Sequence, residues 1–192
     1  MPEAFADLVA RRLDDAARLH TECRSAAAPA AAAAEAMLTS IRGGGKVLVC
    51  GNGGSASDAQ HFAAELVGRF QINRPAMASL ALTTDTSILT AIANDFSYDE
   101  VFSRQVEALG APGDVLLGIS TSGASPSVLA AFALAKARGI VTVALTGRDG
   151  GAIGAAADIH VNVPAVSTAR VQEVHRTLMH AICALVEREL YG

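Results

Sequence analysis

Short, continuously apolar runs alternate with helix-forming segments over most of this 192-residue chain, and this alternation limits the fold more than any other sequence feature. A strand that is apolar at every position is typical of a parallel sheet whose two faces are both covered by helices. The sequence therefore predicts an α/β fold, a three-layer sandwich with a central parallel sheet flanked by helices. The predicted strands are residues 47–50, 80–82, 115–117, 141–145 and 159–163. The predicted helices that accompany them are residues 56–70, 87–93, 99–109, 126–138 and 170–190.

Two further helices are predicted ahead of the first strand. From residue 2 to residue 25, apolar side chains such as Leu8 and Leu13 recur at intervals of three and four, the period of an amphipathic helix. An alanine-rich tract resumes the helical pattern after Pro29 and stops at the three glycines of residues 43–45. We therefore expect a single domain over residues 1–192, made of a helical segment (about 1–45) and a core (about 46–192).

The composition excludes several classes of protein. Fifteen Lys and Arg against 19 Asp and Glu give a net charge of −4, which argues against nucleic acid or a membrane surface as a partner. No run approaches the roughly 18 apolar residues needed to cross a bilayer. The first residues also lack the apolar run of a signal peptide. Cys23, Cys50 and Cys183 are odd in number and lack zinc-finger spacing, so we expect reduced, mostly buried thiols in a cytoplasmic protein.

A glycine-rich turn, Gly51-Asn52-Gly53-Gly54-Ser55, joins the first predicted strand to a helix. Glycines let backbone N–H groups approach an anion, and the amino end of a helix favours negative charge. The string also fits the loose G-x-G-x-x-A dinucleotide pattern, but the acidic residue expected roughly 20 positions later is missing. A phosphate site is therefore favoured over NAD binding. A tight turn that needs glycine for its geometry alone is the remaining alternative.

A second turn after an apolar strand is rich in hydroxyl groups and carries no Lys or Arg. Pro126 fits the first position of the following helix and Ser125 fits its N-cap. The pattern is not a P-loop, because G-x-x-x-x-G-K-[ST] is absent. Two such turns, each after a strand, favour a small phosphorylated ligand over a nucleotide. The hydroxyl-bearing residues of this turn are Ser120, Thr121, Ser122 and Ser125.

Two of the predicted helices carry side chains suited to a metal ion. His61 and Glu65 are four residues apart and so leave one helix face a turn apart. The last helix carries Gln172, Arg176 and His180 at successive steps of four, which keeps them on one broad side. The spacing alone does not show that the two helices converge. Hydrogen-bonded histidines and solvated charges on separate helices are the alternative.

Residues 51–65 resemble the signature of the phosphoheptose isomerases (sedoheptulose 7-phosphate isomerases), a family of the sugar-isomerase (SIS) domain proteins. Further matching strings are residues 93–95, 118–123, 145–147 and 170–175, so the resemblance covers about three quarters of the chain. It implies the SIS, flavodoxin-like fold. It also implies one Zn²⁺ ion per subunit held by His61, Glu65, Gln172 and His180. The substrate-binding residues that it implies are Asn52, Gly53, Gly54, Ser55, Glu65, Arg69, Asn94, Asp95, Ser120, Thr121, Ser122, Ser125 and Gln172.

The implied reaction is the aldose–ketose isomerisation of D-sedoheptulose 7-phosphate to D-glycero-D-manno-heptose 7-phosphate, the first step of nucleotide-activated heptose synthesis. A proton moves between C1 and C2 through a cis-enediol, which requires a base, an acid near the carbonyl oxygen and stabilisation of negative charge. The resemblance gives Glu65 the role of base and His180 that of acid. It further implies a homotetramer whose sites are shared between subunits, with residues 1–45 serving assembly.

Two other functions remain open within the SIS proteins. One is a non-catalytic regulator that binds the replication initiator; such proteins keep the fold while their metal-binding positions are normally lost, whereas here all four are filled. The other is an isomerase or etherase that acts on an amino-sugar phosphate, which a panel of substrates would reveal.

Overall fold

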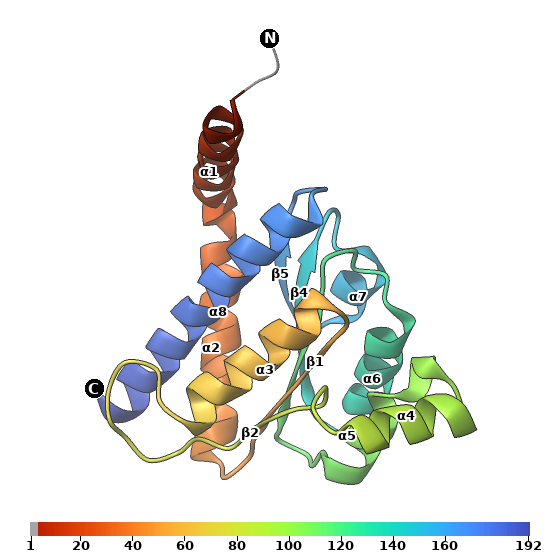
Figure 1. Cartoon of the computed structure of the whole chain (residues 1–192). Coiled ribbons are helices and arrows are strands. Elements are labelled where there is room, and N and C mark those ends of the chain that lie inside the picture. The colour runs from red at the N-terminus through yellow and green to blue at the C-terminus, as the bar shows by residue number, and fades with distance from the viewer. Residues whose placement is uncertain (1–3) are drawn as a thin grey trace.

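One parallel sheet of five strands, in the order β2-β1-β3-β4-β5, forms the centre of the molecule. The computed structural model describes residues 4–192 (Figure 1). All five predicted strands are confirmed, and β3 and β4 run two or three residues further than their apolar runs. The bounds are β1 Val47–Gly51, β2 Ser79–Ala81, β3 Val115–Ser120, β4 Val141–Gly147 and β5 Ile159–Val163.

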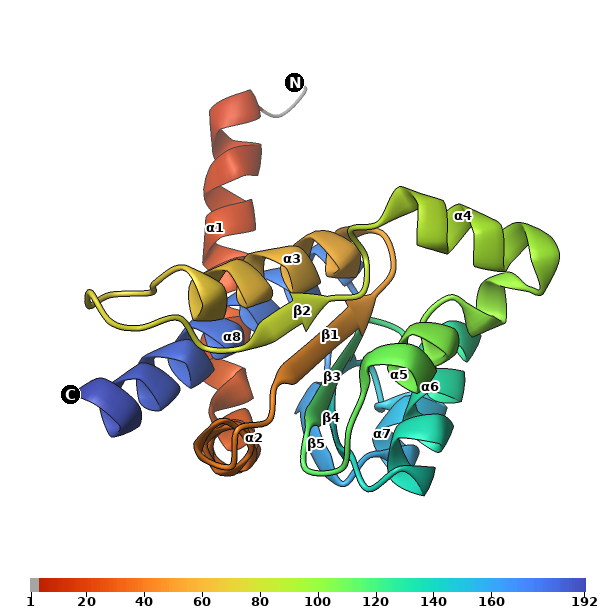
Figure 2. The same ribbon diagram turned by 90° about the horizontal axis from the view of Figure 1, so that it is seen from below.

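Helices cover both faces of this sheet, which confirms the predicted three-layer α/β sandwich. Figure 2, a view turned by 90°, shows α2, α3 and α8 on one face and α5, α6 and α7 on the other. The helices are α1 Phe5–Glu22, α2 Ala27–Arg42, α3 Gly54–Val67, α4 Thr86–Asp95, α5 Ser103–Leu109, α6 Pro126–Ala137, α7 Gly151–Ala156 and α8 Thr168–Tyr191. Short 3-10 helices occupy Cys23–Ala26 and Tyr98–Glu100.

Strand β1 is apolar throughout because its two sides contribute to separate cores. Val47 and Val49 of β1 pack with α2, α3 and α8, whereas Leu48 and Cys50 pack with α5 and α6 on the other face. This is the two-residue alternation of a strand, with both sides buried instead of one. The expectation of buried thiols is also confirmed, since all three cysteines are buried and free.

Three helix predictions need correction. Residues 99–109 do not form one helix, because a 3-10 turn at Tyr98–Glu100 precedes α5. Helix α7 was not predicted, since its glycine-rich sequence has low helix propensity. Helix α2 starts at Ala27 and includes Pro29 in its first turn, where the missing N–H has no intrahelical partner to lose. The predicted start of the first helix at residue 2 lies outside the described residues.

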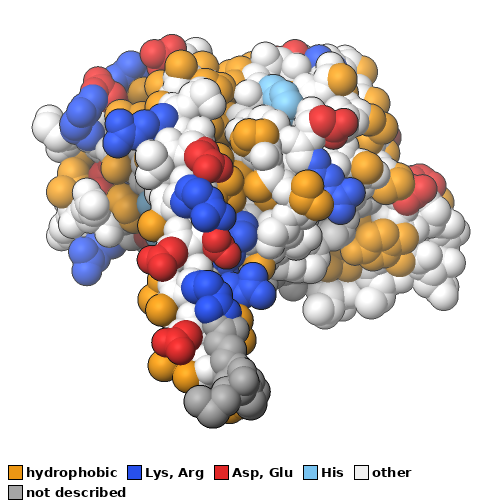
Figure 3. Space-filling view, turned by 90° about the horizontal axis from the view of Figure 1, so that it is seen from above, with side chains coloured by type: hydrophobic (Ala, Val, Ile, Leu, Met, Phe, Trp, Pro, Cys, Tyr) orange, Lys and Arg blue, Asp and Glu red, His pale blue; other side chains and the backbone are white. Residues whose placement is uncertain are grey.

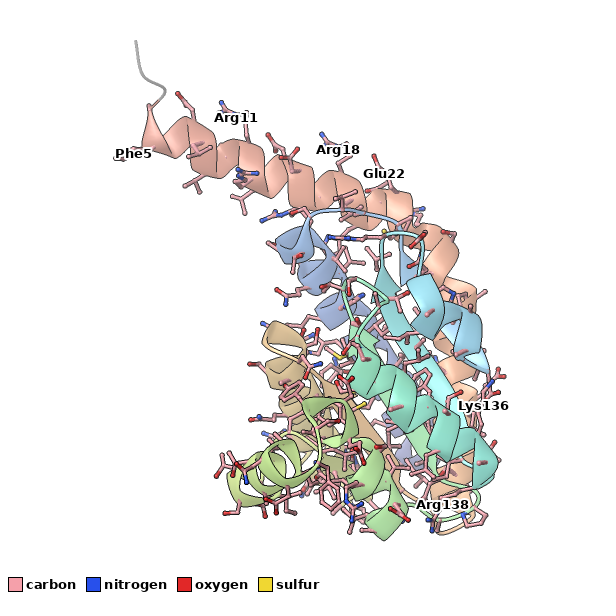
Figure 4. The ribbon with its side chains drawn as sticks, turned by 90° about the vertical axis from the view of Figure 1, so that its right-hand side faces the viewer. Phe5, Arg11, Arg18, Glu22, Lys136 and Arg138 are labelled. Carbon is pink, nitrogen blue, oxygen red and sulfur yellow. The ribbon has the colours of Figure 1, made fainter. Side chains whose placement is uncertain are left out.

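Helix α1 projects away from the sheet as an arm (Figure 4). Two hydrogen bonds join it to α8: the Arg170 guanidinium donates to the Arg12 carbonyl at 2.6 Å, and the His20 ring hydrogen-bonds the Thr177 hydroxyl at 2.9 Å. No residue of α1 is buried. Among the described residues, no helix is both long and apolar enough to span a membrane.

Candidate active site

The glycine-rich and serine-rich turns meet at the carboxyl ends of two adjacent strands. Strand β1 pairs with β2 on one side and with β3 on the other, so the chain leaves β1 and β3 in opposite directions. Ligands of open parallel sheets bind at such a switch point. The turn after β1 leads into α3, and the turn after β3 leads into α6. The predicted pair of anion-binding turns is therefore brought together in space.

A cavity of about 190 Å³ lies between the two turns. No charged side chain lines it. Its polar groups are hydroxyls and one amide, which matches the uncharged phosphate cradle expected from the sequence. The lining residues are Asn52, Ser55, Ile119, Ser120, Thr121, Ser122 and Ser125.

Asn52 ties the two turns together through its side chain. Its amide nitrogen donates to the hydroxyls of Ser125 at 2.8 Å and Ser127 at 3.0 Å, and its amide oxygen accepts from the Tyr98 hydroxyl at 2.8 Å. Ser125 lies at the N-cap of α6 as predicted, but its hydroxyl bonds Asn52 and does not cap the helix. Ser127 and Tyr98 were missed by the sequence analysis, because nothing in their local sequence indicates a contact 46 or 75 positions away.

The backbone of both turns depends on glycine. Gly53 has φ = 58° and Gly123 has φ = 67°, a region that residues with a Cβ rarely adopt. At Gly123 a side chain would also collide with the carbonyl of Gly150 at the start of α7. The amino ends of α3 and α6 lie at the two turns, and the positive ends of their dipoles favour an anion there.

His61, Glu65 and His180 form a compact group between α3 and α8. The two imidazole Nε2 atoms lie 2.9 Å apart, and His61 Nε2 lies 3.2 Å from Glu65 Oε1. One ligand atom from each residue falls within 4.8 Å of the others, and all three side chains are partly exposed. Two nitrogens on tetrahedral zinc, with bonds of about 2.0–2.1 Å, stand roughly 3.3 Å apart. The donors present, two imidazoles and a carboxylate, therefore fit zinc in both type and spacing.

Gln172 contacts the glycine-rich turn in this structure. Its amide packs on the Cα of Gly54, where an added methyl group would collide with it. Between that contact and the histidines, Arg176 Nη2 pairs with Asp58 Oδ1 at 2.7 Å. Eight residues separate Gln172 from His180, which is about 12 Å along the helix at about 1.5 Å per residue. Gln172 therefore lies nearer the glycine-rich turn.

Three other predicted site residues lie away from the cavity lining. Arg69 is exposed just after the end of α3, and Asn94 and Asp95 are exposed at the end of α4. The Asn94 amide donates to the Asp95 carboxylate at 2.7 Å.

His175, next to Arg176, faces the interior, where its Nε2 bonds the Thr146 carbonyl at 2.9 Å. Burial lowers the pKa of His175, although that bond and the nearby charge of Asp58 act in the opposite direction.

These features define a class of protein. The sheet order, the two turns at the switch point and the sequence all agree with the SIS domain, whose family matches residues 13–147. A phosphoheptose isomerase from Aromatoleum aromaticum is 55% identical over 188 residues, covering 96% of this chain and 95% of the relative. The chain therefore belongs to the phosphoheptose isomerase family of SIS-domain enzymes.

Solved structures of the same family share the whole fold. The phosphoheptose isomerase of Neisseria gonorrhoeae, 48% identical, superposes with a TM-score of 0.91 and covers 96% of this chain and 100% of its own. The enzyme of Francisella tularensis, 35% identical, gives a TM-score of 0.93 over 97% of this chain and 100% of its own. The resemblance deduced from residues 51–65 is thus confirmed over nearly the full chain.

Proposed function

We propose that this protein converts D-sedoheptulose 7-phosphate to D-glycero-D-manno-heptose 7-phosphate, the first step of nucleotide-activated heptose synthesis. The observation that carries the proposal is the convergence of His180 of α8 on His61 and Glu65, which lie on the helix that begins at the phosphate cavity. Six residues separate Ser55 at the cavity from His61, about 9 Å along α3 at about 1.5 Å per residue. That spacing suits a ligand whose phosphate and reacting carbons lie at opposite ends.

The hydroxyls of the serine-rich turn hold the phosphate, together with the free N–H groups at the start of α6. At the other end of the substrate, Glu65 removes the proton from C1 or C2 and returns it to the other of these two carbons. His180 exchanges a proton with the oxygens of the same two carbons. Gly53, Gly54 and Ser55 line the sugar between these ends, and Arg69, Asn94 and Asp95 contribute from the rim.

The metal is part of this proposal. His61, Glu65 and His180 would hold one Zn²⁺ per subunit, with Gln172 as the fourth ligand. When bound, zinc supplies a Lewis acid that polarises the carbonyl oxygen and stabilises developing negative charge. A nearby cation lowers the pKa of a carboxylate and makes it a weaker base, so Glu65 would act as the base most effectively with its carboxylate free of the ion.

We further propose that the whole chain is a single SIS domain that assembles as a cytoplasmic homotetramer through its first 45 residues. Four apolar side chains of α1 are between 42% and 88% exposed, and a row of exposed apolar side chains on one helix is typical of an interface between subunits. Figure 3 shows orange apolar side chains along the projecting helix. These four residues, the α1 stripe, are Phe5, Leu8, Val9 and Leu13.

A turnover assay with sedoheptulose 7-phosphate, run before and after chelation and again after zinc is restored, tests the proposal. Activity that is lost on chelation and regained with zinc supports both the reaction and the metal site. Activity that the chelator does not change would support the isomerase reaction but not the metal site, and would leave Glu65 and His180 with acid–base roles only. No turnover in any state, combined with binding of the replication initiator in gel filtration, would replace the isomerase with the regulator.

A further inference from the structure

A buried ion pair outside the reacting groups joins the ends of α3 and α8. Arg74 Nε lies 3.0 Å from Glu187 Oε1, and the two side chains are only 1% and 3% exposed. Arg74 follows α3 in the loop that leads to β2, whereas Glu187 lies in the last two turns of α8. These are the two helices that carry His61, Glu65 and His180.

Glu187 holds the loop after α3 in place. Its carboxylate accepts backbone N–H bonds from Phe70 at 3.1 Å, Gln71 at 2.7 Å and Ile72 at 3.1 Å. The Phe70 backbone is thereby fixed on α8, and its ring centroid lies 5.5 Å from that of His180. The His180 imidazole is thus in contact with two rings, those of His61 and Phe70.

Arg74 fixes the other half of the group. Its Nη2 donates to the carbonyl of Glu65 at 2.7 Å and its Nη1 donates to the carbonyl of Leu66 at 2.8 Å. The last carbonyls of a helix lack intrahelical partners, so Arg74 satisfies the end of α3 at the residue that bears the catalytic carboxylate. Each member of the pair therefore restrains one of the two facing helices close to the site.

Cys183 shows how tightly the charges surround this region. Burial raises the pKa of its thiol to about 12, and the negative charges of Glu65 and Glu187 act in the same direction while Arg74 opposes them. Two charges this deeply buried are costly to remove from water, and an apolar pair of similar size often stabilises a fold better. The bonds by which the two charged groups orient their neighbours give a reason for an ion pair, and not an apolar pair, at this position.

We propose that Arg74 and Glu187 are positioning residues for the His61–Glu65–His180 group, with Phe70 as the contact through which Glu187 orients His180. The zinc readout of the test rests on the proposed metal site, whereas the spectroscopic readout does not. The side chains of Arg74 and Glu187 are almost fully buried, so they act through the groups that they bond. The effect of the pair is on the orientation of the imidazole and carboxylate before any ligand arrives.

The test compares Glu187→Gln with Asp114→Asn. Asp114 is an equally buried carboxylate that accepts backbone N–H bonds and pairs with Lys46 at 2.7 Å, but among the described residues its bonds go to Lys46 and Ala111 and not to the loop after α3. Both changes remove one buried charge, so they should lower the thermal midpoint alike. The first readout is the NMR signal of the His180 ring in 13C-histidine-labelled, chelator-treated full-length protein, assigned by its loss in His180→Gln. The second readout is zinc affinity, measured by competition with a chromophoric chelator.

In Glu187→Gln the NMR signal of the His180 ring should shift in the same direction as it does in Phe70→Leu. Zinc should bind this variant about ten-fold more weakly than it binds wild type, which is the lower end of the losses seen when ligand-orienting groups are changed. Asp114→Asn should leave both readouts unchanged. An unmoved His180 signal in Glu187→Gln, with a lowered thermal midpoint, would overturn the proposal and leave the pair a structural role. If Glu187→Gln does not fold, Arg74→Lys replaces it, because this variant keeps the charge but not the bonds to the carbonyls of α3. Zinc binding weaker than that of wild type would support the proposal, and zinc binding equal to that of wild type would overturn it.

If wild-type protein binds no zinc, the metal assignment fails, and the NMR comparison still decides the positioning role on its own.

Discussion

The Nε2 atoms of His61 and His180 lie 2.9 Å apart, although 119 positions separate the two residues in the chain. Two imidazole nitrogens at this distance cannot face each other with two lone pairs or with two protons. Either one proton is shared between them or a cation lies where both lone pairs point. With the Glu65 carboxylate 3.2 Å from the same His61 nitrogen, the group brings three donor atoms together around one position.

Replacing His180 with Gln should abolish turnover while the fold remains intact. The amide cannot act as an acid near neutral pH, and it is a poorer zinc ligand than imidazole. We expect kcat to fall by roughly 100-fold or more, the range of a lost general acid. Turnover of sedoheptulose 7-phosphate and a thermal melt check the two parts. Activity close to that of wild type would rule out both the acid and the ligand roles of His180.

Replacing Ser120 and Ser122 together with Ala should raise KM and change kcat little. Each hydroxyl contributes about 0.5–1.5 kcal/mol through its hydrogen bond to the phosphate. The two together correspond to a KM increase of roughly 5- to 150-fold. Thr39→Ala, which removes an exposed hydroxyl on α2, serves as the control. An unchanged KM in the double variant would remove the serine-rich turn from the site.

Replacing Leu13 with Glu should break the proposed assembly. Leu13 is 67% exposed in the α1 stripe, and a buried charge at an interface between subunits is costly. Light scattering on the wild type should give four times the chain mass of 19.6 kDa, and the variant a smaller particle. Arg18→Gln is the control, since Figure 4 shows Arg18 pointing away from the body of the molecule. An identical mass for wild type and Leu13→Glu would contradict the role of α1.

The Arg74–Glu187 pair should make stability depend on pH in the acid range. Burial raises the pKa of Glu187, but the three backbone N–H bonds and Arg74 outweigh it, so the pKa lies below its usual range. The unfolded chain then binds the proton more readily, and stability rises with pH. The contribution is complete above about pH 4.3, the ordinary value for glutamate, and is lost as the pH falls through the folded-state value.

Chemical denaturation of wild type and Glu187→Gln at pH 7 and at low pH checks this dependence. At pH 7 the variant should be less stable by about 3–5 kcal/mol, the usual cost of removing one partner of a buried pair. The difference should shrink at pH 3.5. A gap of the same size at both pH values would show that the charge of Glu187 is not what stabilises the loop.

Most of the fold could be predicted because its strands are encoded locally. Runs such as residues 115–117 are apolar at every position, and they need no distant partner to be recognised. Helix α7 could not be predicted, because its stability depends on packing around Gly123 and Gly150 and not on propensity. The start of the predicted helix 99–109 was wrong for a related reason: a 3-10 turn sets Tyr98 toward Asn52.

Each part of the site that lies on one helix or one turn could be predicted from the sequence, but the meeting of these parts could not. His61 and Glu65 share a helix face by spacing alone, and the two turns follow adjacent strands. The meeting of His180 with His61 was outside the reach of spacing, because it depends on how α8 returns across the sheet. The Arg74–Glu187 pair gave no signal at all, since an arginine and a glutamate 113 positions apart look like two solvated charges until the fold buries both.

The cavity between the two turns contains hydroxyls and an amide and no cationic side chain. A doubly charged sugar phosphate approaching a chain of net charge −4 is not drawn in from a distance, so encounter depends on unaided diffusion. Raising the ionic strength should therefore leave capture unharmed or speed it slightly, where an arginine-lined site would lose rate. The same neutrality lets the product leave without breaking an ion pair, which favours rapid release over tight retention.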